Sequence, residues 1–166
     1  MWYYLGVIPD ADFTETEMAL EPDMMAFARR LNQASQGERE RLIRSGVAAS
    51  HIQDLVETMH VSSERLLSML NMPSSSVRRK IRQGVMLSPE HSERVLGLVC
   101  LIGQVTVMVE DSGNPNEFDA ARWVGEWLER PLPALGGAKP SAYMDTTTGQ
   151  KLVSNLLVQS QLGVFM

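Results

Sequence analysis

The chain has 166 residues, of which 44% are hydrophobic and 21% charged, with a formal net charge of −5. This composition is typical of a globular protein with enough chain to bury a core, in one domain or in two small domains packed together. Its single cysteine, Cys100, excludes an intramolecular disulfide and a cysteine-rich zinc site.

The apolar stretches do not have the form of a signal peptide or a membrane span. Residues 1–9 read MWYYLGVIP, which lacks a basic start and is followed by acidic residues. The apolar run over residues 92–109 contains Glu93, Arg94 and Gln104. We therefore expect no membrane association and a location in the cytoplasm.

Helical periodicity begins after residue 22, and only residues 1–7 have strand character. Asp23 can cap a first helix, whose apolar residues recur at helical spacing: Met24, Phe27, Ala28 and Leu31. A second helix over residues 38–45 ends at Gly46, which suits a left-handed cap. Ser50 can start a third helix over residues 51–59.

Residues 62–84, SSERLLSMLNMPSSSVRRKIRQG, predict two short helices separated by a turn. Ser62 is the expected cap of the first helix, and three apolar residues face inward: Leu66, Met69 and Leu70. We expect residues 71–73, Asn-Met-Pro, to form the turn, because asparagine tolerates the left-handed conformation and proline disfavours a helical residue before it.

The second helix of this pair carries a basic stripe in an otherwise acidic protein. Residues 61–84 contain five basic residues against one acid, a local charge of +4. Ser74 can cap this helix, Val77 and Ile81 point to the core, and Gly84 ends it. A helix of this size fits the major groove of DNA. Its expected DNA-binding residues are Ser74, Ser75, Ser76, Arg78, Arg79 and Arg82, against the simpler reading of a solvated basic face.

The remaining chain is also predicted to be helical. Ser88 and Pro89 start a long helix that runs to about Asp111, and a further helix spans residues 116–129 with Trp123 and Trp127. After a loop rich in proline and glycine, residues 140–146 form a short helix and residues 148–162 a longer one. Four of the last helix's apolar positions are Leu152, Leu156, Val158 and Leu162.

Three segments of this chain resemble the Xre/MbcA/ParS family of antitoxins, both in their sequence and in their order along the chain. Residues 127–140, WLERPLPALGGAKP, with Thr146, Gly149 and the ending LGVFM, are similar to its toxin-binding domain. Residues 62–84 are similar to its Xre-like helix-turn-helix, and residues 87–94, LSPEHSER, to the entry of the helix that joins the halves. Leu67 and Asn71 depart from the common repeat, which has a small residue and a glycine there.

The resemblance implies an all-α fold with an N-terminal helix-turn-helix domain followed by a helical toxin-binding domain. We assign residues 1–22 to an extension of unknown role, 23–87 to DNA binding, and 88–166 to dimerisation and toxin binding. The toxin-binding residues would be those of the loop and the chain's end: Leu135, Gly136, Gly137, Lys139, Pro140, Val164, Phe165 and Met166. The glycines also fit a plain turn between two helices.

The expected function is therefore that of an antitoxin without chemistry of its own. The resemblance implies that it blocks the active site of a RES-type, NAD-degrading toxin and binds operator DNA as a homodimeric autorepressor. The alternative is a stand-alone transcription regulator whose C-terminal half dimerises or senses a ligand. Catalysis finds little support, because His51, His60 and His91 lie apart in the sequence. We expect no cofactor and no metal.

Overall fold

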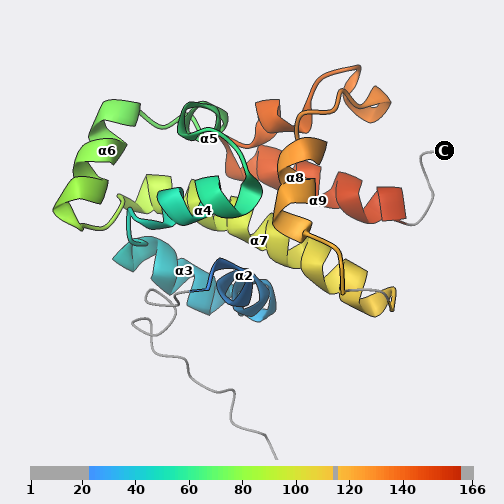
Figure 1. Cartoon of the computed structure of the whole chain (residues 1–166), viewed down its shortest axis with the longest axis horizontal. Helices are drawn as coiled ribbons and strands as arrows, with labels where there is room; N and C mark the ends of the chain where they lie inside the picture. The colour runs from blue at the N-terminus through green and yellow to red at the C-terminus, as the bar shows by residue number, and fades with distance from the viewer. Residues whose placement is uncertain (1–22, 114–115, 162–166) are drawn as a thin grey trace, which may run out of the picture.

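The computed structural model describes residues 23–113 and 116–161, and the regular elements of these ranges are all helical (Figure 1). The elements are α2 (Met24–Gln33), α3 (Gln36–Ser45), α4 (His51–Met59), α5 (Ser63–Met69), α6 (Ser74–Gln83), α7 (Pro89–Asp111), α8 (Ala120–Trp127), the 3-10 turns η1 (Pro133–Leu135) and η2 (Pro140–Tyr143), and α9 (Thr147–Gln161). The expected all-α fold is confirmed over these residues. Ala48 and Met86 form an isolated antiparallel bridge. The strand expected in residues 1–7 lies outside the described residues.

The long helix α7 is the centre of the fold. Helices α2 and α3, which precede it in the chain, and α8 and α9, which follow it, all pack against it. Two glycines admit its neighbours closely. A Cβ on Gly103 would lie 2.1 Å from the backbone oxygen of Ala28, and one on Gly97 would lie 1.7 Å from the side chain of Gln150. One contiguous core therefore runs through α7 from α2 to α9.

This role also explains the apolar composition of α7. It is long and apolar enough to cross a membrane by length and composition alone. Val95, Leu98, Val99 and Ile102 are fully buried against neighbouring helices. The apolar residues of α7 are therefore those of a central core helix.

Most predicted helix starts of the N-terminal half are confirmed by their caps. The side chains of Asp23, Ser62 and Ser88 each accept a hydrogen bond from a backbone N–H of the first turn. Helix α4 spans His51–Met59 with Ser50 in the cap position, as predicted, although the Ser50 side chain makes no capping hydrogen bond. The second helix begins at Gln36 and not at residue 38, because Ser35 and Glu38 form a reciprocal capping box.

The C-terminal helices differ more from expectation. Helix α8 begins only at Ala120, because the Asp119 side chain caps it by accepting from the N–H of Arg122 at 3.0 Å. In α9 the buried hydrophobic residues are Val153, Leu156 and Leu157, whereas Leu152 and Val158 are each 40% exposed. Leu162, which we counted among the apolar positions of this helix, lies outside the described residues.

Candidate functional site

Helices α5 and α6 form the predicted helix-turn-helix. Asn71 has a φ of 49°, the left-handed conformation expected at the turn. The N–H of Met72 donates to the carbonyl of Leu67 at 2.8 Å, which closes the end of α5. The buried residues of the unit are Leu66, Leu67, Leu70, Met72 and Val77. Met69 and Ile81, which we expected to face inward, are only half-buried.

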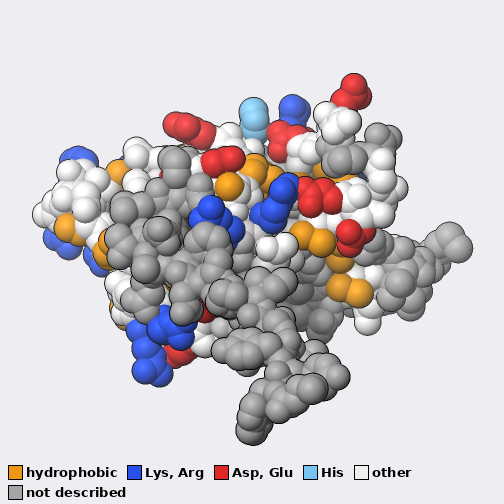
Figure 2. Space-filling view, turned by 90° about the horizontal axis from the view of Figure 1, so that it is seen from below, with side chains coloured by type: hydrophobic (Ala, Val, Ile, Leu, Met, Phe, Trp, Pro, Cys, Tyr) orange, Lys and Arg blue, Asp and Glu red, His pale blue; other side chains and the backbone are white. Residues whose placement is uncertain are grey.

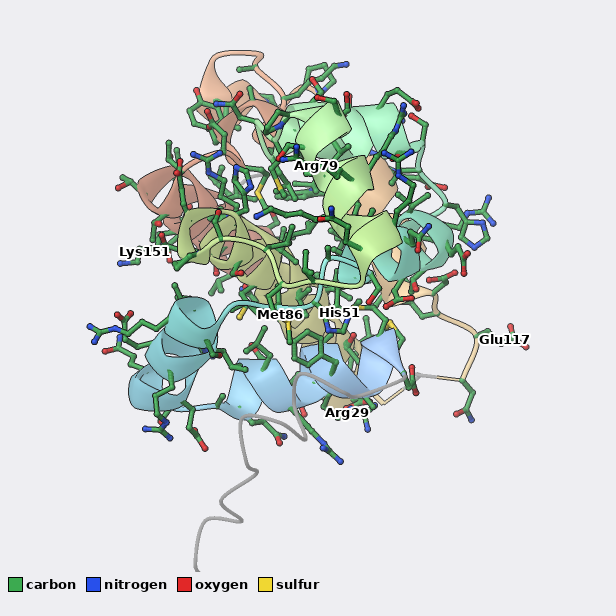
Figure 3. All side chains as sticks on the ribbon, turned by 90° about the vertical axis from the view of Figure 1, so that its left-hand side faces the viewer. Arg29, His51, Arg79, Met86, Glu117 and Lys151 are labelled. Carbon is green, nitrogen blue, oxygen red and sulfur yellow. The ribbon has the colours of Figure 1, made fainter. Side chains whose placement is uncertain are left out.

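The outer face of α6 carries the predicted DNA-binding residues. Five of the six are exposed: Ser74, Ser75, Arg78, Arg79 and Arg82. Ser76 is half-buried. Helix α6 lies at one edge of the molecule, and Figure 3, viewed from that edge, shows Arg79 on the helix nearest the viewer. The helix ends at Gly84, as predicted, and Gly84 adopts the left-handed conformation.

The N-terminus of α6 has no side-chain cap. Ser74 is the first helical residue and Pro73 occupies the cap position, so the prediction that Ser74 caps the helix was wrong. Proline has no hydroxyl with which to cap, and the N–H groups of the first turn keep their donor capacity. Free N–H groups at a helix N-terminus attract anions, and phosphate is the anion that DNA presents to such a helix.

One of the three predicted DNA-binding arginines of α6 is already paired. The guanidinium of Arg78 donates to Glu64 of α5 at 2.7 Å, and both side chains are more than half exposed. A DNA phosphate next to α6 would compete with Glu64 for this charge. Arg79 and Arg82 have no such pairing among the described side chains.

Arg94 of α7 holds the helix-turn-helix in place, a role that the sequence analysis missed. Its guanidinium donates to the carbonyls of Leu70 and Asn71 at 3.3 and 2.8 Å, and to Glu90 at 2.6 Å. The side chain is 17% exposed. The guanidinium of Arg94 hydrogen-bonds the carbonyls at the end of α5. It thereby holds the turn in place and fixes the orientation of α6.

The predicted partner-binding loop is a compact turn between α8 and η2. The N–H of Leu132 donates to Ala138 at 3.0 Å, and the N–H of Gly137 donates back to Leu132 at 3.0 Å. Gly136 and Gly137 have φ of 64° and 86°, a conformation that side chains with a Cβ rarely adopt. The surface that the loop presents there is bare backbone, which a partner can approach closely.

Around the loop, the predicted binding residues differ in exposure. Gly136, Gly137 and Lys139 are exposed, Leu135 is half-buried against the core, and Pro140 is buried. Pro140 therefore shapes the loop from inside. The residues 164–166, also predicted to bind a partner, lie outside the described residues.

Lys139 is anchored within the chain. Its Nζ lies 3.0 Å from Oε2 of Glu129, and the same oxygen lies 3.2 Å from the guanidinium of Arg65 on α5. Glu129 is 23% exposed. One carboxylate thus joins the loop to the helix-turn-helix, next to a hollow of about 370 Å³ that all three side chains line.

Of the residues considered for catalysis, His51 is buried, His91 and Cys100 are half-buried, and His60 is exposed. The His51 ring stacks on Phe27 at 5.1 Å, inside the core. Burial, and secondly the charge of Arg94, lower the pKa of His91. Burial raises the pKa of the Cys100 thiol, which disfavours the thiolate that nucleophilic chemistry needs.

Comparison with known proteins finds a family domain in each half of the chain. Residues 28–99 match the antitoxin Xre-like helix-turn-helix domain, and residues 117–161 match the antitoxin Xre/MbcA/ParS C-terminal toxin-binding domain. The chain is 43% identical over 137 residues to the Prs ADP-ribosylating antitoxin of Sphingobium sp. (strain YBL2), covering 82% of this chain and 86% of that protein. It is 25% identical over 117 residues to Antitoxin Xre of Yersinia enterocolitica, covering 68% and 73%.

The basic helix α6 and the loop between α8 and η2 lie apart in Figure 1, α6 at the left of the view and the loop at the upper right. Each falls within the matching domain, in the same order along the chain. The chain therefore belongs to the Xre/MbcA/ParS family of antitoxins, with an Xre-like helix-turn-helix and a C-terminal toxin-binding domain.

Proposed function

We propose that this antitoxin neutralises an NAD-cleaving toxin of the RES type and represses its own transcription by binding operator DNA as a homodimer. It acts in the cytoplasm and has no catalytic chemistry of its own. The observation that carries the proposal is the separation of the two surfaces. Because α6 and the loop lie apart, one chain can hold DNA and toxin together.

The toxin half of the proposal rests on the loop and on the named relative. The bare backbone at Gly136 and Gly137 lets a partner approach the loop without meeting side chains. The name of the Sphingobium relative links that antitoxin to ADP-ribosylation. ADP-ribosyl transfer from NAD and NAD degradation both break the bond between nicotinamide and ribose. A toxin of either kind needs an open cleft, and an antitoxin seated over that cleft blocks it sterically.

The DNA half rests on the charge and geometry of α6. An exposed face with Arg79 and Arg82, and an uncapped N-terminus, suit the major groove of an operator. Helix-turn-helix repressors commonly read two half-sites as dimers, so we expect a palindromic operator.

Co-expression with the neighbouring gene tests both halves. Expressing that gene alone should arrest growth and lower cellular NAD or ADP-ribosylate a target protein, and adding this antitoxin should reverse both effects. The purified antitoxin should shift a fragment of its own promoter and leave an unrelated fragment of equal length unbound. A chain that shifts the promoter but relieves no toxicity would instead be a stand-alone transcription regulator.

A further inference from the structure

A second exposed surface lies at the opposite end of α8 from the loop. It is an open hollow of about 360 Å³ between the ends of α7, α8 and α9. We call it the aromatic groove, and its apolar lining residues are Val105, Met108, Val109, Phe118, Trp123 and Leu157. Ser112 and Ser160 are its polar lining residues.

The aromatic side chains of the groove form a ladder that runs from the surface into the core. Phe118 is 39% exposed and lies 6.1 Å from Trp123, measured between ring centroids. Trp123 in turn stacks on the buried Trp127 at 5.9 Å. A rigid aromatic anchored in this way offers contact area at little entropic cost, which is typical of binding hot spots.

Acidic residues adjoin the groove. Asp111 and Glu117 are exposed, and their side chains have no ion pair among the described residues. Figure 3 shows Glu117 pointing away from the fold, and Figure 2 shows hydrophobic and acidic side chains together at the right-hand end of the molecule. Two further acids, Glu110 and Asp119, are next to lining residues in the sequence, and Glu110 pairs with Arg29. We call these four acidic residues the rim of the groove. The unpaired carboxylates of Asp111 and Glu117 attract cations and repel acidic partners.

The place of the groove in the chain indicates its occupant. Phe118, Trp123 and Leu157 all fall within residues 117–161, the toxin-binding match. The groove and the Gly136–Gly137 turn lie at the two ends of α8, so a partner that lies along this helix can contact both. A partner complementary to an apolar floor and an acidic rim carries an apolar side chain flanked by lysine or arginine.

We propose that the aromatic groove is a second docking site for the toxin, and that it takes an apolar or aromatic toxin side chain flanked by basic residues. The proposal rests on the proposed neutralisation of a toxin, which it extends from the loop to the whole length of α8. The rim accelerates association by steering, and the ladder slows dissociation by burying the anchor.

Binding of the full-length antitoxin to the purified toxin of the neighbouring gene tests the groove. Phe118→Ser should weaken binding by about tenfold to a hundredfold, mainly through faster dissociation. Val85→Ser is the matched control, because Val85 is 42% exposed and lies in the helix-turn-helix half. Glu117→Lys should slow association and flatten its salt dependence, whereas Glu57→Lys on the exposed surface of α4 should not.

A second measurement uses the unmodified chain, so it tests the groove even if the Phe118→Ser variant does not fold. Toxin binding should protect Met108 from peroxide oxidation, measured by mass spectrometry against Met86, which is 47% exposed and lies far from the groove. Unchanged toxin affinity of a folded Phe118→Ser variant, or unprotected Met108, would overturn the groove proposal alone. A loss of self-association with toxin affinity intact would assign the groove to a second copy and overturn it too. Failure of the wild-type chain to bind the toxin overturns the proposed function itself.

Discussion

Arg65, in the first helix of the helix-turn-helix, and Glu129, directly before the toxin-binding loop, form an ion pair of 3.2 Å. The same Glu129 oxygen also pairs with Lys139 of the loop, at 3.0 Å. The two basic residues are 74 positions apart (139 − 65) and belong to the two family domains. A partner that separates Lys139 from Glu129 removes one of the two positive charges at this carboxylate, and so changes the electrostatic environment of Arg65. The pair is therefore a physical link between the two binding surfaces.

Glu129→Gln should uncouple operator binding from toxin binding. The neutral amide holds neither cation strongly, so the ratio of operator affinities with and without toxin should move toward one. Coupling between binding sites is reciprocal, and the ratio of toxin affinities with and without operator should change by the same factor. Glu126→Gln is the control, because among the described residues Glu126 pairs with Arg122 of its own helix, at 3.2 Å, and with no other cation. An unchanged ratio in Glu129→Gln would show that the link carries no coupling.

Arg79→Ala and Arg82→Ala should each weaken operator binding by about 1–3 kcal/mol where the arginine reads a base, and should lower the salt slope where it contacts phosphate. Arg78→Ala should cost less, because Arg78 has to give up its pair with Glu64 before it can contact DNA. The control is Arg44→Ala, whose side chain is 77% exposed on α3. Fluorescence anisotropy with a promoter fragment at several salt concentrations measures both quantities. Equal operator affinity of the Arg79/Arg82 double variant and the control would remove α6 from the interface.

Arg94→Met should lower stability and operator affinity together. The substitution keeps the apolar stem but leaves the carbonyls of Leu70 and Asn71 without their donor, a loss of about 1–3 kcal/mol. Because those carbonyls lie at the end of α5, their loss of a donor makes the turn less rigid, and the orientation of α6 is then less well fixed. Arg122→Met, which removes a surface pair of α8, is the control and should leave both quantities nearly unchanged. Urea unfolding and promoter binding by the same preparations separate the stability change from the change in DNA affinity.

Local chemistry predicted much of the fold, whereas tertiary contacts decided what was missed. Helix ends depend on contacts within one helical turn, so they can be predicted from neighbouring residues in the sequence. This holds for the N-caps Asp23, Ser62 and Ser88 and for the C-cap Gly84. The capping box of Ser35 and Glu38 was equally readable and was overlooked. The exposure of Arg79 and Arg82 follows from the helical wheel of α6.

The contacts that define the sites depend instead on how helices cross. Arg78 meets Glu64 because α5 and α6 pack at a particular angle, and Arg94 reaches the turn because α7 passes beneath it. The pairing of Glu129 with Arg65 joins segments that only the folded core brings together. No periodicity in the sequence contains this information.

Acidification should destabilise the antitoxin through His91. Its folded pKa lies below the unfolded value of about 6.5, because burial and Arg94 disfavour the charged ring. Between these two values the unfolded state binds more protons, so the free energy of unfolding falls as pH falls through that window and is constant above it. His91→Gln should reduce this slope. Urea unfolding between pH 5 and pH 8, in about half-unit steps, measures the slope.

Gly136→Ala should weaken toxin neutralisation more than it weakens the fold. Gly136 has a φ of 64°, and a Cβ added there meets no atom within 4 Å, so the substitution acts through backbone strain of about 1–2 kcal/mol. Gly84→Ala is a matched control, with a φ of 65° and equally open surroundings at the end of α6. Both variants should lose similar stability in urea unfolding. Only Gly136→Ala should lose affinity for the toxin, because it changes the backbone that the loop presents. Equal toxin affinities for the two variants would place the contact away from this turn.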